Sequence, residues 1–127
     1  MIVDSSAIIA ILRTEPGWER LEAALLGAAA ISIAAGTMLE TRIVAIRLGI
    51  VRRLDDFLAG NPLQIVPTDH RQVDLAAEGL PRFGKGRHPA GLNFGDCFAY
   101  ALARLLDEPL LLAGRDFAQT DLKLALR

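Results

Sequence analysis

The sequence predicts an α/β fold in which a small, mostly parallel sheet of four or five strands is flanked by helices on both sides. Short apolar runs, typical of buried strands, alternate along the chain with segments whose apolar residues recur at helical spacing. The chain of 127 residues is long enough for one core and too short for two ordinary domains. We therefore expect a single domain over residues 1–127.

Four apolar runs have the length and composition of short buried strands. They are Ile2–Val3, residues 29–34 (AAISIA), 63–67 (LQIVP) and 110–114 (LLLAG), and a further edge strand is expected near Leu124. Because helical segments separate the runs, the strands are expected to pair in parallel. Parallel pairing brings their carboxyl ends to one edge of the sheet, where α/β proteins place their binding sites.

Glycine and proline bound the segments that are expected to be helical. These segments are residues 5–15, 18–27, 37–50, 51–62, 69–80 and 96–109, with Asp69 as the N-cap of the fifth. Residues 81–95 (PRFGKGRHPAGLNFG) hold four glycines and two prolines and therefore predict a long loop. Long ordered loops in compact domains tend to be functional.

Composition and charge exclude several classes of protein. With only Cys97 and two histidines, the chain lacks the ligands of a structural zinc site, so any metal must be bound by oxygen. No apolar stretch of about 20 residues predicts a membrane helix. No signal-peptide pattern surrounds Asp4, so we expect a cytoplasmic protein. The net charge of −1 predicts that basic character is local.

Glu40 stands out among the acidic residues. It shares a helical stripe with Ile43 and Val44, which must face the sheet. An ionised carboxylate in such a place is costly unless it is paired or bound to metal. Pairing with Arg42 or Arg47 is the structural alternative to metal binding.

Three more acids are expected near the same edge of the sheet. Asp4 directly follows the first strand, Asp96 starts a helix, and Asp116 follows the fourth strand. Four convergent carboxylates repel one another, and a divalent cation removes that conflict. Oxygen-only ligation is what Mg²⁺ or Mn²⁺ prefers, and such an ion hydrolyses phosphodiesters by activating water and balancing charge on the phosphate.

Each of these acids also has a purely structural interpretation that the sequence leaves open. Asp4 can be the N-cap of the first helix. Asn93 and Asp96 have the spacing of a capping box. Asp116 can be the Asx-turn residue of the segment Gly114-Arg115-Asp116.

Four segments of the sequence carry a family resemblance that extends over nearly the whole chain. In order, they are IVDSSAIIAIL, MLETRIVAIRLG, GLNFGDCFAYALA and LLLAGRDFAQTD. Together they resemble the PIN-domain ribonucleases, and within them the VapC-type toxins of bacterial toxin–antitoxin pairs. The resemblance implies a PIN fold and a metal-dependent endoribonuclease that cuts a structured RNA, such as tRNA or rRNA, and is inhibited by a VapB-type antitoxin.

The resemblance also implies roles for individual residues. The catalytic acids that bind Mg²⁺ or Mn²⁺ correspond to Asp4, Glu40, Asp96 and Asp116. Supporting roles correspond to Ser6, Asn93 and Asp121. Asp121 is also an alternative to Asp116 as the fourth ligand. The assemblies implied are a homodimer and a toxin–antitoxin hetero-oligomer.

The segment that is expected to contact RNA precedes Asp96. Its candidate residues are Arg82, Lys85, Arg87 and His88. No acid lies among them, and the neighbouring glycines let the backbone approach phosphate closely. Phe83 and Phe94 are candidates for stacking on an unpaired base, although Phe94 is expected in the core.

Two other classes of function stay open at this stage. One is a phosphoryl-transfer domain with an aspartate nucleophile. One kind of such domain has a second Asp two residues after the first, but Ser6 stands at that place here. Another kind has paired acids early in the chain, whereas the paired acids here are Asp55 and Asp56. The other is a catalytically inactive member of the fold that binds RNA or a partner. Thermal melting with and without a metal ion distinguishes this last class. An ion that binds the folded chain raises its melting temperature, and the absence of such a rise would favour the inactive, binding-only member.

Overall fold

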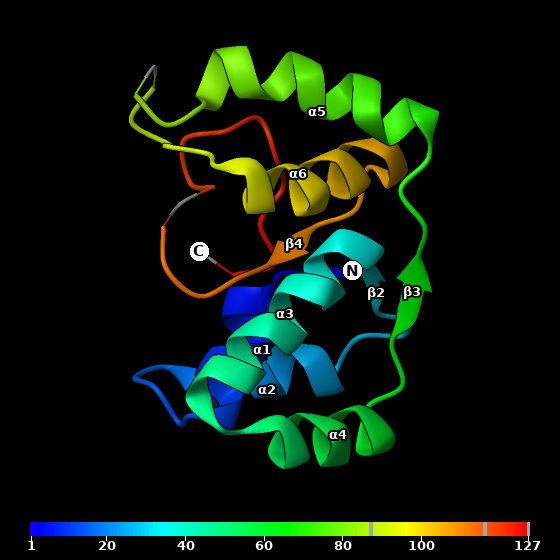
Figure 1. Ribbon diagram of the computed structural model, residues 1–127, viewed down its shortest axis with the longest axis vertical. Helices are drawn as coiled ribbons and strands as arrows, with labels where there is room; N and C mark the ends of the chain where they lie inside the picture. The colour runs from blue at the N-terminus through cyan, green and yellow to red at the C-terminus, as the bar shows by residue number, and fades with distance from the viewer. Residues whose placement is uncertain (87, 116, 127) are drawn as a thin grey trace.

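A four-stranded parallel sheet, with the strand order β3-β2-β1-β4, forms the centre of the computed structural model (Figure 1). The structure describes residues 1–86, 88–115 and 117–126. The strands are β1 (Ile2–Val3), β2 (Ser32–Ala34), β3 (Gln64–Val66) and β4 (Leu110–Leu111). The predicted α/β class is confirmed, and the expected edge strand is an isolated bridge between Leu110 and Leu124.

Within the described residues, six helices cover the sheet. They are α1 (Ser5–Leu12), α2 (Trp18–Leu26), α3 (Ala35–Leu48), α4 (Val51–Gly60), α5 (His70–Phe83) and α6 (Phe94–Leu106). In Figure 1, α5 and α6 lie above the sheet and α1 to α4 lie below it. None of these helices has the length and apolar character needed to cross a bilayer.

The strands β1 and β4 send their side chains into two separate apolar cores. Ile2 and Leu110 pack with Tyr100 and other residues of α6 on one face. Val3 and Leu111 pack with residues of α1, α2, α3 and α4 on the other. These four residues are fully buried, which explains why β1 and β4 appear in the sequence as continuous apolar runs. Helices on both sides of the sheet are thus observed as predicted.

The start of α6 differs from the predicted one. The helix begins at Phe94, two residues before Asp96, because Asn93 is its N-cap and accepts a hydrogen bond from the amide of Asp96 at 3.0 Å. Similarly, α3 begins at Ala35, two residues before the predicted start. The predicted N-cap at Asp69 is confirmed, because its carboxylate accepts a hydrogen bond from the amide of Gln72.

The loop before α6 is shorter than predicted, because α5 continues through Pro81 to Phe83. A proline lacks an amide hydrogen and usually ends a helix. Here the last turn is anchored by Phe83, which is buried and packs against Tyr100 with the ring centroids 6.0 Å apart. Burial of this ring extends the helix beyond the point where local sequence predicts its end.

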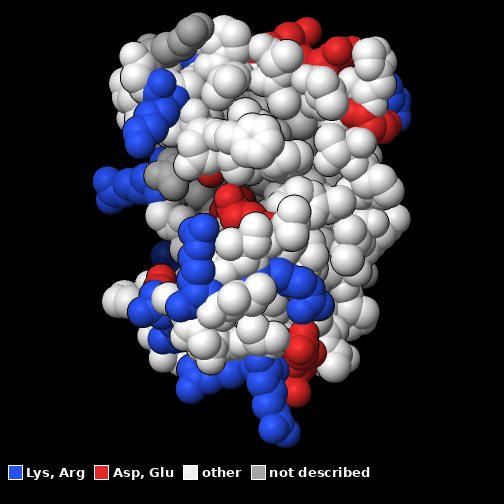
Figure 2. All heavy atoms as spheres, viewed as in Figure 1, with Lys and Arg blue, Asp and Glu red and all other residues white. Residues whose placement is uncertain are grey.

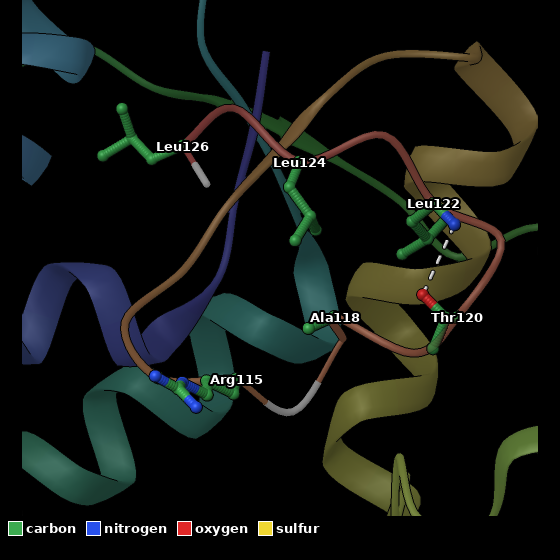
Figure 3. A pocket seen from close by; sticks show the side chains of 7 residues that line it. Arg115, Ala118, Thr120, Leu122, Leu124 and Leu126 are labelled. Atoms are coloured by element: carbon green, nitrogen blue, oxygen red, sulfur yellow. Dashed lines mark hydrogen bonds between the residues drawn. The ribbon is translucent and has the colours of Figure 1, made fainter.

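The segment after β4 folds back along the edge of the sheet. The amide of Leu110 donates to the carbonyl of Lys123, and the amide of Ala125 donates to the carbonyl of Leu110, both at 2.9 Å. Farther out, this segment lines a cavity of about 540 Å³, shown in Figure 3, whose walls include Thr120, Leu122 and Leu124. The described candidate acids do not line this cavity.

We predict that Gly79→Ala destabilises the fold by about 1–3 kcal/mol, because a methyl group at this buried position would overlap the ring of Tyr100. Urea unfolding measures the change. Gly60→Ala is the matched control, since a methyl group there would meet nothing within 4 Å. Equal unfolding midpoints for Gly79→Ala and the parent would contradict this account of how α5 and α6 pack.

Candidate active site

Asp4 lies directly after β1 and is the N-cap of α1. Its carboxylate accepts hydrogen bonds from the amide of Ser6 at 3.0 Å and from the hydroxyl of Ser6 at 2.6 Å. The side chain is only 4% exposed. Burial raises the pKa of Asp4 above its ordinary value, and the charge of Glu40 raises it further, although the bonds from Ser6 act in the opposite direction. Asp4 is therefore the N-cap of the first helix, and it also lies in an environment that opposes ionisation of its carboxyl group.

Ser6 links this carboxylate to the neighbouring strand. Its hydroxyl oxygen accepts a hydrogen bond from the amide of Ala113 at 3.1 Å, which leaves the hydroxyl hydrogen for Asp4. In addition, the amide of Asp4 donates to the carbonyl of Leu111 at 2.9 Å. The ends of β1 and β4 therefore fix the orientation of the Asp4 carboxylate together.

Glu40 reaches the same place from α3. Its carboxylate accepts a hydrogen bond from the hydroxyl of Ser5, the first residue of α1. It also packs against Gly95 of α6 so closely that a Cβ atom there would overlap Glu40 Oε2. The pairing of Glu40 with Arg42 is not observed, because Arg42 forms an ion pair with Asp55 at 2.9 Å.

Asp96 is the third residue of α6 and follows Gly95 directly. It forms a reciprocal capping box with Asn93, in which the amide of Asn93 donates to Asp96 Oδ2 at 2.9 Å and the amide of Asp96 donates to Asn93 Oδ1 at 3.0 Å. The contact of Gly95 with Glu40 places the start of α6 at the same edge as the other two acids. Figure 2 shows acidic atoms in a hollow between α3 and the start of α6, with basic side chains around it.

The structure brings the candidate acids together only in part. Among the described residues, no three histidine, cysteine or acidic side chains lie close enough to hold one ion together. The electrostatic pair that it does show is Asp4 with Glu40. Asp116 lies outside the described residues. Asp121, the alternative fourth ligand, instead accepts a hydrogen bond from the hydroxyl of Tyr100 at 3.1 Å and pairs with Arg104.

The donor set nevertheless fits a hard divalent cation. Asp4, Glu40 and Asp96 offer carboxylate oxygen only, which suits Mg²⁺ and Mn²⁺. None of the ion pairs that join described residues includes Asp4 or Glu40. A buried carboxylate next to a second carboxylate is stabilised by a cation that touches both.

Two of the residues that were predicted to contact RNA have local partners. Arg82 pairs with Asp121 at 3.5 Å, and its guanidinium lies 4.8 Å from the centre of the Phe83 ring. His88 accepts a hydrogen bond from the amide of Ala90 at 3.0 Å and contacts Phe83 edge-on. His88 therefore helps to hold the loop to the end of α5, and Arg82 joins the end of α5 to the segment that contains Asp121.

The other two candidates on this loop differ from these. Lys85 has an exposed side chain, while its amide donates to the carbonyl of Leu92 at 2.8 Å and so holds the loop backbone. Arg87 lies outside the described residues. Lys85 and Arg82 are thus both exposed, and they differ in that Arg82 is paired with Asp121.

Three features of this region were not predicted from the sequence. The first is the bond between Ser5 and Glu40, which are 35 residues apart and share no local pattern. The second is the role of Gly95, although a glycine next to a candidate acid could have signalled close backbone approach. The third is Phe94, whose predicted place in the core is wrong, because the side chain is 80% exposed. Phe94 is the first residue of α6, and its position there turns it away from the sheet.

Comparisons with known proteins identify the family. The PIN domain model matches residues 1–123. Ribonuclease VapC of Mycolicibacterium smegmatis is 44% identical over 124 residues, which cover 95% of this chain and 96% of the relative. The chain therefore belongs to the PIN-domain family. Within it, the chain groups with the VapC ribonucleases, so the predicted family and enzyme class, a nuclease, are confirmed.

Solved structures share the fold at much lower sequence identity. The crystal structure of Mycobacterium tuberculosis VapC20, a Sarcin-Ricin loop cleaving toxin, has a TM-score of 0.74 at 16% identity and covers 95% of both chains. A toxin–antitoxin complex from Klebsiella pneumoniae has a TM-score of 0.71 at 17% identity and covers 94% of this chain and 92% of that one. These similarities confirm the predicted PIN-like fold.

We predict that Gly95→Ala impairs the site while leaving the fold intact. The added methyl group would displace the Glu40 carboxylate, which is the end of a flexible side chain and can move at little cost in stability. The melting temperature without metal should therefore change little, whereas its rise on addition of Mn²⁺ should shrink. Gly60→Ala, in open space, should keep the full rise. An unchanged rise in Gly95→Ala would show that Glu40 takes no part in ion binding.

We predict that Asp4→Asn raises the melting temperature at neutral pH when chelator is present. The folded chain raises the pKa of Asp4, so the stabilising proton is held at low pH and lost as pH rises through that raised pKa. The ionised parent is then the less stable protein, by about 1.4 kcal/mol per unit of pKa change. Thermal melts of both proteins from about pH 4 to about pH 7 should show the difference growing with pH. A difference that shrinks with pH would contradict the direction of the shift.

Proposed function

We propose that this chain is the toxin of a toxin–antitoxin pair and acts as a metal-dependent endoribonuclease on a structured RNA such as tRNA or rRNA. The observation that supports this function is the buried Asp4 carboxylate beside Glu40 at the carboxyl edge of a parallel sheet. Family membership supports the reaction class, since the matched relative is named a ribonuclease. The fold of VapC20, a Sarcin-Ricin loop cleaving toxin, supports a structured RNA as substrate.

Mg²⁺ or Mn²⁺ is the cofactor in this proposal. The residues that would hold it are Asp4, Glu40, Asp96 and Asp116. When bound, the ion supplies Lewis-acid activation of the attacking water and neutralises charge at the reacting phosphate.

The other side chains of the site position these acids. Ser6 donates to Asp4 and is itself held by the amide of Ala113, so the Asp4 carboxylate keeps one orientation. Ser5 does the same for Glu40 from the neighbouring position of α1. Asn93 holds Asp96 through the capping box. Fixed ligands of this kind reduce the reorganisation needed when an ion binds.

The basic loop positions the RNA chain in this proposal. Lys85 offers an exposed charge beside α6, and Arg82, Arg87 and His88 complete the set. Such contacts to phosphate fix the register of the strand and carry no sequence information. Asp121 then acts indirectly, by holding Arg82 at 3.5 Å near the end of α5.

The proposed partner in the cytoplasm is a VapB-type antitoxin, in a hetero-oligomer that also contains a toxin homodimer. The similar fold from Klebsiella pneumoniae belongs to a toxin–antitoxin complex, which supports this partner. Several large apolar side chains are exposed on the chain alone, including Ile46, Leu48 and Val73. Exposed apolar surface of this kind is typical of proteins that bind other proteins.

We predict that Asp4→Asn and Asp96→Asn each lower RNA cleavage by more than the roughly 10- to 100-fold that loss of a supporting residue costs. Each change removes a ligand charge and keeps the shape of the side chain. The control is Asp55→Asn, an exposed acid paired with Arg42. The assay follows cleavage of purified tRNA and rRNA with Mn²⁺ present.

The melting temperature of the parent is the second measurement. Millimolar Mn²⁺ should raise it, because an ion that binds only the folded state stabilises that state. Parental cleavage rates in both variants would refute the assigned site. No cleavage by the parent and no shift with Mn²⁺ would favour the inactive, binding-only member of the fold.

A further inference from the structure

We propose that a pocket between α3 and α6 binds one unpaired nucleobase of the RNA, stacked against Phe94, next to the phosphate that is cleaved. The inference rests on the proposed function and adds a substrate contact to it. The pocket has a volume of about 380 Å³. This lies near the lower end of the roughly 300–1,000 Å³ that small-molecule sites occupy, so the pocket has room for one base.

An exposed aromatic pair forms the α6 side of the pocket. Phe94 is 80% exposed, which is unusual for so large an apolar side chain. Its ring meets the ring of Phe98 edge-on, with the centroids 5.2 Å apart and the planes at 82°. Phe98 is half-buried and therefore holds Phe94 in place. A fixed ring with a free face is what a nucleobase stacks on.

The α3 side of the pocket supplies apolar contact. Leu39 and Ile43 line it, and both are exposed in the chain alone. The backbone of α3 at Gly36, which also lines the pocket, packs directly against the ring of Phe98, because a Cβ atom at Gly36 would overlap that ring. Apolar side chains that line an exposed pocket suit the apolar faces of a nucleobase that enters from solvent.

The pocket is continuous with the candidate active site. Glu40 and Gly95 line the pocket, and the same Glu40 carboxylate interacts with Asp4. In RNA, a base and the adjoining phosphate are joined through a single ribose. A base in this pocket therefore brings its own phosphate to the edge where Asp4 and Glu40 lie.

Charge at the pocket rim also favours RNA as the occupant. Arg47 is the basic residue that lines the pocket, on the same helix as Glu40. A guanidinium there can contact the phosphate of a neighbouring nucleotide. Aromatic rings beside a basic side chain are the composition of sites for single-stranded nucleic acid.

The test is a cycle of changes in the protein and in the RNA. The probe is a short, labelled stem–loop RNA of defined sequence that carries, in an unpaired loop, the site at which the parent cuts tRNA or rRNA, and abasic ribose replaces one loop nucleotide at a time. Cleavage in Mn²⁺ gives kcat/KM for the parent, Phe94→Ala, Phe94→Trp and Leu26→Ala. Leu26 is an exposed apolar residue on α2 and serves as the matched control.

We expect Phe94→Ala to lower kcat/KM by about 5- to 150-fold, the range that loss of one stacked base implies. Phe94→Trp should restore the rate, and Leu26→Ala should leave it unchanged. At one position next to the cut, removal of the base should slow the parent by a similar factor and Phe94→Ala hardly at all. Such non-additivity is the signature of a direct contact.

The other outcomes overturn the inference, and they do so in distinguishable ways. If the parent and Phe94→Ala cleave equally, or if the losses add at every position, the proposed function stands and the base pocket does not. If Phe94→Ala instead converts an oligomer to a monomer in solution, the pocket is an interface between copies of the chain. If the parent cleaves no RNA with Mn²⁺ present, both the proposed function and the base pocket fall.

Discussion

The repulsion between two carboxylates that the fold holds at the end of a parallel sheet governs the rest of the site. Asp4 is buried, its pKa is raised, and Glu40 adds a second negative charge close by. Neither charge stabilises the folded protein at this place, because desolvation and the repulsion between like charges both oppose ionisation there. The hydroxyls of Ser5 and Ser6 relieve part of the strain by hydrogen bonding, and they leave the charge itself uncompensated. The fold therefore keeps a place that a divalent cation stabilises.

The surroundings of the two acids show how the chain tolerates this arrangement. Three elements converge on it, and each contributes a backbone group or a small side chain rather than a counter-charge. The amide of Ala113 holds Ser6, Gly95 makes room for Glu40, and the first turn of α1 places both serines. Meanwhile Arg42, which the sequence places near Glu40, pairs with Asp55. Keeping basic side chains out of the pair preserves its affinity for an ion at the expense of stability.

The sequence predicted the sheet, the helices and the convergence of Asp4 with Glu40, because each depends on local periodicity or on the topology of parallel strands. It predicted element ends less well. The last turn of α5 depends on burial of Phe83. The start of α6 depends on which residue is its N-cap, and the sequence offers both Asn93, which is the cap, and Asp96, which lies three residues later. Contacts such as Ser5 with Glu40 arise from packing between distant segments, so no local spacing encodes them. The exposure of Phe94 has the same origin, since its helical position decides its direction.

The bond between Ser6 and Ala113 has a consequence for synthesis of the protein. It joins two residues that are 107 positions apart, and the first acid depends on it for its orientation. A ribosome that has made only α1 to α3 has produced Asp4 and Ser6 without the segment at β4 that orients them. The growing polypeptide thus carries its acids in an unassembled form until β4 has been translated and has joined the sheet. The site is thus completed late in synthesis, because the segment that orients its first acid is among the last to be made.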